Sequence, residues 1–204
     1  ALRQLADRHG ILLVFDEVQC GMGRTGKLWA HEHWNVQPDI LCSAKGIASG
    51  MPLGAMLARK SLMEWAPGAH ATTFGGNPVA CAASLATLDL LYDGGLMANA
   101  TAMGERLMAR LRQMQTRHPC IGDVRGMGLM VGVEMVDDGA SPAGTPSASP
   151  PLARDLFPGR NAARRDRIVQ MAFRKGLLLL GCGRNALRFC PPLTVNADEV
   201  DVAM

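Results

Sequence analysis

The feature that most constrains the fold of this chain is a pair of short apolar runs, each followed by a charged residue. Residues 11–15 (ILLVF) lead into Asp16, and residues 40–44 (ILCSA) lead into Lys45, which stands directly before Gly46. Runs of β-branched and large apolar residues predict buried, parallel strands. Because open α/β sheets bind ligands at the carboxyl ends of their strands, the pattern predicts Asp16 and Lys45 at that edge.

An acid and an amine at one sheet edge fit two interpretations. The first is a Schiff-base cofactor site, in which Lys45 carries the aldehyde and Asp16 pairs with a protonated ring nitrogen. A free lysine is nearly all ammonium at pH 7, so this chemistry requires desolvation or a neighbouring positive charge. The second interpretation is a salt bridge without catalytic function. The two residues by themselves do not separate these interpretations.

The neighbouring sequence contains further motifs. In chain order they are DEVQCGMGRTGK at 16–27, AKG at 44–46, PLGA at 52–55, TTFGGNP at 72–78, RGMGL at 125–129 and LRFCPPL at 187–193. This ordered set resembles the class III aminotransferases of the ornithine, 4-aminobutyrate and acetylornithine type. The resemblance covers nearly the whole chain except a stretch around residues 137–163. It implies an α/β architecture, that of the fold type I transferases that depend on pyridoxal 5'-phosphate.

The order of the predicted elements indicates two domains. We expect residues 1–95 to form the C-terminal part of a large, mostly parallel-sheet domain that binds the cofactor. We expect residues 96–204 to form a small α+β C-terminal domain. Asp93-Gly94-Gly95 separates two long helical patterns and marks the boundary. Residues 137–163 are rich in Ser, Pro, Gly and Ala, which predicts a mobile loop.

Shorter patterns predict the remaining elements. They are a helix over 1–10, a strand over 53–58, helices over 78–91 and 97–117, an antiparallel strand pair within 122–135, a helix over 164–174, strands over 177–180 and 186–190, and a helix opening at Asp198.

The first residues, ALRQLADRHG, open directly into an amphipathic helical pattern and do not resemble a natural N-terminus. The resemblance implies a long preceding segment, with a Gly-rich turn for the cofactor phosphate and an aromatic residue that stacks on its ring. We therefore expect the chain to be a C-terminal fragment that is inactive alone.

The resemblance also implies roles for residues around the proposed cofactor. Lys45 matches the catalytic lysine that forms the Schiff base and then moves the proton between substrate and cofactor. Asp16 matches the catalytic acid that keeps the pyridine nitrogen protonated. Gln19 matches the residue that hydrogen-bonds the ring oxygen, and Val18 packs on the ring face. No role follows for Glu17, for which we expect a structural hydrogen bond.

Two further residues are implied more distantly along the chain. Thr73 matches the threonine that binds the cofactor phosphate of a neighbouring subunit, which implies a homodimer with a shared active site. Arg188 matches the arginine that holds the substrate carboxylate, and the fork of its guanidinium suits a bidentate contact. From the residues alone, Thr73 also fits a turn and Arg188 a solvent-facing strand position.

Composition excludes several other classes. The chain has 204 residues, 48% hydrophobic residues, 19% charged residues and a formal net charge of +3, which indicates a globular protein without a nucleic-acid footprint. No apolar stretch is long enough to cross a membrane. The six cysteines lack metal-ligand spacing and indicate neither a metal site nor a disulfide framework, so we expect a cytoplasmic protein.

The predicted activity is the transfer of an amino group from an amino acid or ω-amino acid to a 2-oxo acid, by a ping-pong mechanism. A racemase or epimerase of the same cofactor family is the nearest alternative. A catalytically incompetent fragment is another. A third alternative is a P-loop at 21–27 (GMGRTGK), although Leu28 stands where a P-loop has Ser or Thr.

Overall fold

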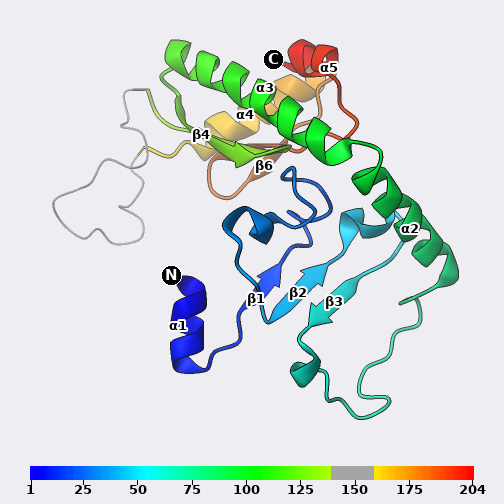
Figure 1. Ribbon diagram of the computed structural model, residues 1–204. Helices are drawn as coiled ribbons and strands as arrows, with labels where there is room; N and C mark the ends of the chain where they lie inside the picture. The colour runs from blue at the N-terminus through cyan, green and yellow to red at the C-terminus, as the bar shows by residue number, and fades with distance from the viewer. Residues whose placement is uncertain (139–158) are drawn as a thin grey trace. The chain divides into compact units, whose positions relative to one another are not determined.

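The computed structural model describes residues 1–138 and 159–204, which form two compact units. Unit 1 comprises Ala1–Ala100 and unit 2 comprises Thr101–Met204. The sequence boundary predicted after residue 95 lies just before the junction of the two units. Each unit contains one β-sheet and its own helices (Figure 1).

The sheet of unit 1 has three strands in the order β1-β2-β3. Strand β1 (Val14–Asp16) pairs in parallel with β2 (Ile40–Ser43), as predicted. Strand β3 (Ala55–Ala58) pairs with the other side of β2, but in antiparallel direction. The sheet is therefore mixed, and its parallel part is the pair that leads into the two charged residues.

The expectation that both parallel strands are buried is correct only for β2. In β2, Leu41 and Ser43 are buried. The run before Asp16 is largely exposed, with Ile11 59% and Val14 51% accessible. The physical reason is position, because β1 is an edge strand of this sheet while β2 is paired on both sides.

Two helices flank the sheet of unit 1 in sequence. Helix α1 (Leu2–His9) ends at Gly10, which adopts the left-handed conformation with φ 61° that glycine tolerates best. Helix α2 (Pro78–Tyr92) begins with proline in its first turn and is capped by Asn77, whose side chain accepts the Ala80 N–H at 2.8 Å.

Short 3-10 helices fill the connections. They are η1 (Ala30–Trp34), η2 (Lys45–Ala48) and η3 (Lys60–Leu62). Helix α2 contacts η2, where Ala48 and Ala80 are both fully buried. The Ser49 and Thr87 hydroxyls are 2.9 Å apart and add a hydrogen bond between the same two elements. Helix α2 thus backs the turn that carries Lys45.

The sheet of unit 2 has four antiparallel strands in the order β4-β5-β7-β6. Their bounds are β4 (Ile121–Met127), β5 (Met130–Met135), β6 (Leu180–Cys182) and β7 (Ala186–Phe189). The predicted pair within 122–135 is the hairpin β4–β5. The predicted strand over 177–180 is wrong in position, because only Leu180 of that leucine run has a partner on β7.

Three helices complete unit 2. They are α3 (Leu96–Arg117), which begins in unit 1, α4 (Ala162–Arg174) and α5 (Ala197–Ala203). The three agree closely with the helices predicted from residues 97, 164 and 198 onward. The buried residues of α3 include Leu107 and Leu111, and the sheet contributes Val131, Val133 and Met135 to the core. Most of the predicted loop over 137–163 lies outside the described residues.

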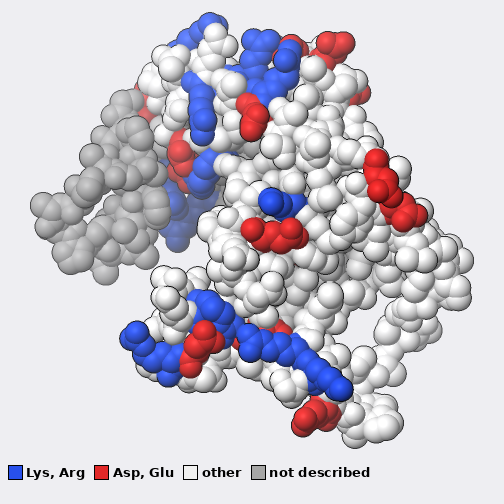
Figure 2. Space-filling model, viewed as in Figure 1, with Lys and Arg blue, Asp and Glu red and all other residues white. Residues whose placement is uncertain are grey.

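The described surface carries mixed charge. On the face shown in Figure 2, basic and acidic side chains are interspersed. Among the described residues, no cluster of three or more His, Cys, Asp or Glu side chains could hold a metal ion. In the same part of the chain, no single helix has the length and apolar character of a membrane span, and only the broken pair α2 plus α3 passes that test, by length and composition alone.

Candidate active site

Asp16 and Lys45 occupy the same edge of the unit 1 sheet. Asp16 is the last residue of β1 and lies opposite Cys42 of β2, and Lys45 follows β2 after Ala44. Both side chains are exposed. The Asp16 Oδ1 accepts the Val18 N–H at 3.0 Å, which fixes the direction of the carboxylate. The sheet topology therefore brings the acid and the amine to one edge, as a parallel pair requires.

The backbone of Lys45 is unusual. Its φ is 48°, in the left-handed region that residues other than glycine rarely adopt. Such conformations persist where the surrounding structure holds them, and they gather at functional sites. Gly46, the next residue, allows Met22 to pack closely against this turn, because a Cβ at position 46 would lie 3.3 Å from the Cβ of buried Met22. The turn presents the lysine at the sheet edge.

Gln19 lies in the turn after β1 and contacts Lys45. Its Oε1 accepts a hydrogen bond from the Lys45 Nζ at 2.5 Å. The structure thus brings Gln19 into contact with Lys45, 26 residues away in the sequence, at the sheet edge where Asp16 also lies. Val18 belongs to the same turn and is half-buried.

The same turn contains the carboxylate of Glu17, for which the sequence predicted only a structural hydrogen bond. It is only 3% exposed and accepts N–H groups from Ala30 and His31 at 2.6 and 2.8 Å. Burial, together with the nearby Glu17 carboxylate, raises the pKa of the Cys20 thiol to about 11. Cys20 is therefore a protonated thiol at neutral pH.

Thr73 lies in the exposed segment that leads to α2. The hydroxyl of its neighbour Thr72 accepts the Gly75 N–H at 3.3 Å, and a Cβ on Gly75 would lie 2.1 Å from the Thr72 methyl group. A side chain at position 75 would therefore require the Thr72 side chain to move. Asn77 anchors the end of the segment by donating to the carbonyls of Phe74 and Pro52 at 2.9 and 3.3 Å.

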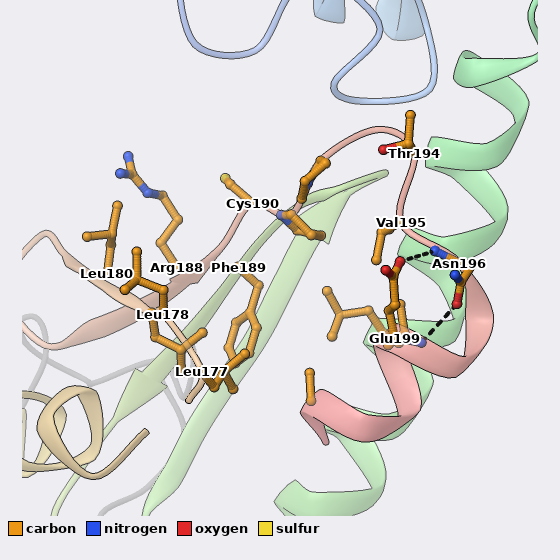
Figure 3. A pocket seen from close by; sticks show the side chains of 16 residues that line it. Leu177, Leu178, Leu180, Arg188, Phe189, Cys190, Thr194, Val195, Asn196 and Glu199 are labelled. Atoms are coloured by element: carbon orange, nitrogen blue, oxygen red, sulfur yellow. Dashed lines mark hydrogen bonds between the residues drawn. The ribbon is translucent and has the colours of Figure 1, made fainter. Parts of the chain in front are cut away.

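Arg188 lies in unit 2, on β7, between Gly132 of β5 and Leu180 of β6. It lines a pocket of about 550 Å³ that is walled mainly by apolar residues of unit 2. Figure 3 shows Arg188 on the same side of the pocket as Leu180, with Asn196 and Glu199 on the other side.

The Arg188 Nε is buried and has no hydrogen-bond partner among the described residues. A buried donor without an acceptor is costly, so this guanidinium is suited to an acceptor that comes from a ligand.

The glycine-rich loop over 21–27 does not form a P-loop. In a P-loop, the lysine opens an α-helix whose N-terminus binds phosphate. Here Lys27 is exposed and is followed by residues 28 and 29 and then by η1, a short 3-10 helix. Gly21 serves packing instead, because a Cβ there would lie 2.8 Å from both the Glu17 carbonyl and the Trp29 ring.

Comparison with known proteins places this geometry in a family. The model of the class-III aminotransferases matches residues 1–204, the whole chain. The chain belongs to the class-III aminotransferases. Acetylornithine aminotransferase of Synechocystis is 43% identical over 204 residues, covering 100% of this chain and 42% of that protein. The 5-aminovalerate aminotransferase DavT of Pseudomonas putida is 43% identical over 203 residues, covering 98% of this chain and 44% of that protein.

Solved structures agree with this membership. A Bacillus anthracis aminotransferase superposes with a TM-score of 0.85 at 31% identity, covering 99% of this chain and 45% of that one. A pyridoxal-phosphate-bound amine transaminase from an uncultivated Pseudomonas species superposes with a TM-score of 0.81 at 38% identity. The match covers 99% of this chain and 44% of that one. The fold is thus that of the fold type I pyridoxal-phosphate enzymes, and the chain spans less than half the length of these relatives.

The residues at the sheet edge fit the cofactor of the class-III family. Lys45 offers an exposed primary amine for the aldehyde, and Asp16 offers an exposed carboxylate for a protonated ring nitrogen. Gln19 adds an amide within hydrogen-bonding reach of the amine. These three groups have the chemistry that pyridoxal phosphate requires.

Proposed function

We propose that the protein containing this chain transfers an amino group from an amino acid or ω-amino acid to a 2-oxo acid, with pyridoxal phosphate as cofactor. The observation that carries this proposal is the edge formed by Asp16, Gln19 and Lys45. The named relatives act on acetylornithine and 5-aminovalerate, which supports a donor of the ornithine or 4-aminobutyrate class. Those relatives are aminotransferases, which favours transfer over the racemase alternative.

Bound pyridoxal phosphate supplies an aldehyde that condenses with amines and a ring that accepts electrons from the substrate carbon. Lys45 would hold the aldehyde through Nζ and would carry the proton to and from the substrate carbon. Asp16 holds a proton at the ring nitrogen, because a carboxylate stabilises that cation. Gln19 orients the ring by a hydrogen bond, and Val18 packs on its face.

The two half-reactions use one site in turn, in a ping-pong cycle. The amino donor enters and leaves as an oxo product, and the 2-oxo acid then enters and leaves as an amino acid. We propose that Arg188 binds the carboxylate of both substrates, which its buried and unpartnered Nε supports.

We further propose a homodimer in which Thr73 binds the cofactor phosphate of the second copy. The helix that follows Thr73 supports this arrangement. Helix α2 is rich in apolar residues, and its exposed side chains include Val79, Leu85, Leu90 and Tyr92, each at least 57% accessible. A helix that is apolar on all sides is normally covered, and a second copy would cover it.

Cys20, Cys42, Cys81, Cys120 and Cys182 are free thiols. We infer a reducing compartment, the cytoplasm, because free thiols persist there.

The proposed function is tested by trapping the lysine. Full-length protein is incubated with pyridoxal phosphate and reduced with borohydride, and the labelled peptide is identified by mass spectrometry. We expect the label on Lys45 and none on Lys27, Lys60 or Lys175. Lys45→Ala should abolish both label and transamination, whereas Lys60→Ala should preserve both. A folded protein labelled elsewhere, or not at all, would contradict the proposal.

The same experiment on residues 1–204 alone tests whether this part suffices. We expect no stable label there, because the chain spans 42–44% of the named relatives and their remaining part is needed to hold the phosphate and the ring. Equal labelling of both proteins would show that the cofactor site is complete within this chain.

A further inference from the structure

We propose that Glu17 is a positioning residue for the cofactor edge. Its buried carboxylate fastens the turn after β1 and so holds Asp16 and Gln19 at the positions from which they serve Lys45. The inference rests on the proposed function and adds to it a residue that does not itself contact the cofactor.

The side-chain contacts of Glu17 join two distant segments. Its Oε2 accepts the Ala30 N–H at 2.6 Å, and its Oε1 accepts the His31 N–H at 2.8 Å. The His31 Nδ1 lies 3.0 Å from the same Oε1. Among the described residues, the main hydrogen-bond donors to this buried carboxylate are thus the N–H groups at the start of η1. Hydrogen bonds to a charged acceptor are stronger than those between neutral groups.

The main-chain groups of Glu17 connect the turn after β1 to β2, the strand that precedes Lys45. Its N–H donates to the Cys42 carbonyl at 2.9 Å, which extends the β1–β2 pairing toward Lys45. Its carbonyl accepts the Gly21 N–H at 2.9 Å and closes a turn over residues 17–21. Gln19 lies inside that closed turn, and Asp16 immediately precedes it.

The turn has little freedom elsewhere. Gly21 is pressed between the Glu17 carbonyl and the Trp29 ring, where no Cβ fits. The Cys20 thiol lies 3.6 Å from the Glu17 Oε2. The position of Gln19 therefore depends on the contacts that Glu17 makes. If they are lost, the amide that now lies 2.5 Å from the Lys45 Nζ shifts with the turn.

The decisive variant is Glu17→Gln in the full-length protein loaded with pyridoxal phosphate. Glutamine has nearly the same shape but places an NH2 group against one of the backbone N–H donors of Ala30 and His31. We expect borohydride to trap the cofactor on Lys45 still. We expect cofactor release to accelerate by about 10- to 100-fold, since small misplacements at a site carry losses of this order. The visible circular dichroism of the bound cofactor should weaken, because its orientation is less fixed.

The matched control is Glu32→Gln. Glu32 caps the same 3-10 helix by accepting the Trp29 N–H at 2.8 Å, but its side chain is exposed. This variant should release the cofactor at the wild-type rate with an unchanged dichroism spectrum. If Glu17→Gln behaves like Glu32→Gln in both measurements, Glu17 stabilises the fold only and the inference is wrong.

A second pair of variants decides the matter should Glu17→Gln not fold. His31→Asn keeps an N–H donor near the position of Nδ1, whereas His31→Leu removes it. We expect faster cofactor release for His31→Leu and near-wild-type release for His31→Asn. Equal, wild-type release for both would overturn the inference. Absence of label on Lys45 in the wild-type protein would instead overturn the proposed function, so the two failures are distinguishable.

Discussion

Asp16 illustrates how much of this site is set at the scale of single residues. Its carboxylate direction is fixed by one local bond, in which Oδ1 accepts the Val18 N–H. In the proposed function, the charge at this position is the property that stabilises a protonated ring nitrogen. Side-chain geometry and side-chain charge can therefore be separated by one substitution.

Asp16→Asn is that substitution, because the amide oxygen of asparagine still accepts the Val18 N–H while the charge is lost. We expect kcat/KM for transamination to fall on the order of 100-fold or more, as when a charge-stabilising group is removed from an active site. The thermal unfolding midpoint should stay close to that of the wild type. Steady-state kinetics and thermal unfolding measure the two quantities, and a fall of less than about threefold in kcat/KM would assign the proton at the ring nitrogen to another group.

At the scale of elements, helix α3 shows how close packing constrains sequence. Ala100, Gly104, Leu107 and Leu111 share one face of this helix and are buried. Gly104 lies against the turn between β4 and β5, and a Cβ there would lie 2.2 Å from the Gly128 carbonyl oxygen. A backbone atom at that distance cannot move aside as a flexible side chain does. The helix therefore needs glycine at this position.

Gly104→Ala sets two effects against each other. Alanine favours the helix by about 1 kcal/mol over glycine, whereas overpacking costs about 1–3 kcal/mol or more. Because the clash is with backbone, we expect net destabilisation and a lower unfolding midpoint. Ala102→Gly, at an exposed position of the same helix, is the control and should cost about 1 kcal/mol through propensity alone. A higher midpoint for Gly104→Ala would show that α3 can move away from the turn.

At the scale of the whole molecule, the described chain divides into two units, and in unit 1 the buried acid Asp39 joins three segments. The Asp39 Oδ2 accepts the Leu13 N–H at 2.7 Å and an Arg3 guanidinium N–H at 2.6 Å, and Oδ1 lies 3.1 Å from Arg59. The Leu13 N–H and Arg3 hold the pKa of the Asp39 carboxyl below its usual value. This carboxylate joins α1, the segment before β1 and the end of β3.

The lowered pKa fixes the sign of a pH effect. A carboxyl group whose pKa is lower in the folded state contributes its full stabilisation above the unfolded value of about 3.9, and loses it as the pH falls through the folded value. Asp39→Asn should therefore lower the unfolding midpoint at pH 5 to 7, and the difference from the wild type should shrink below about pH 4. Thermal unfolding of both proteins between pH 7 and pH 3 measures it. A difference that persists undiminished at pH 3 would show that shape and not charge matters at Asp39.

The sequence by itself determined the helices, most of the strands and the placement of Asp16 and Lys45 at the ends of parallel strands. These features depend on periodicity, caps and breaks among near neighbours, as Asn77, Pro78 and the Asp93-Gly94-Gly95 break show. The motifs that identify the family are likewise runs of adjacent residues. Local signals of this kind can be read without knowing the tertiary contacts.

Only the tertiary structure decided which contacts hold the site together. Partners elsewhere in the chain determine three features of the strands. They are the antiparallel direction of β3, the exposure of β1 and the short pairing of β6 with β7. The proposed role of Glu17 could not be predicted from the sequence for the same reason. Its carboxylate oxygens accept hydrogen bonds from Ala30 and His31, thirteen and fourteen residues away. Backbone N–H groups carry no side-chain signature, so no sequence pattern marks them as the partners of a buried acid.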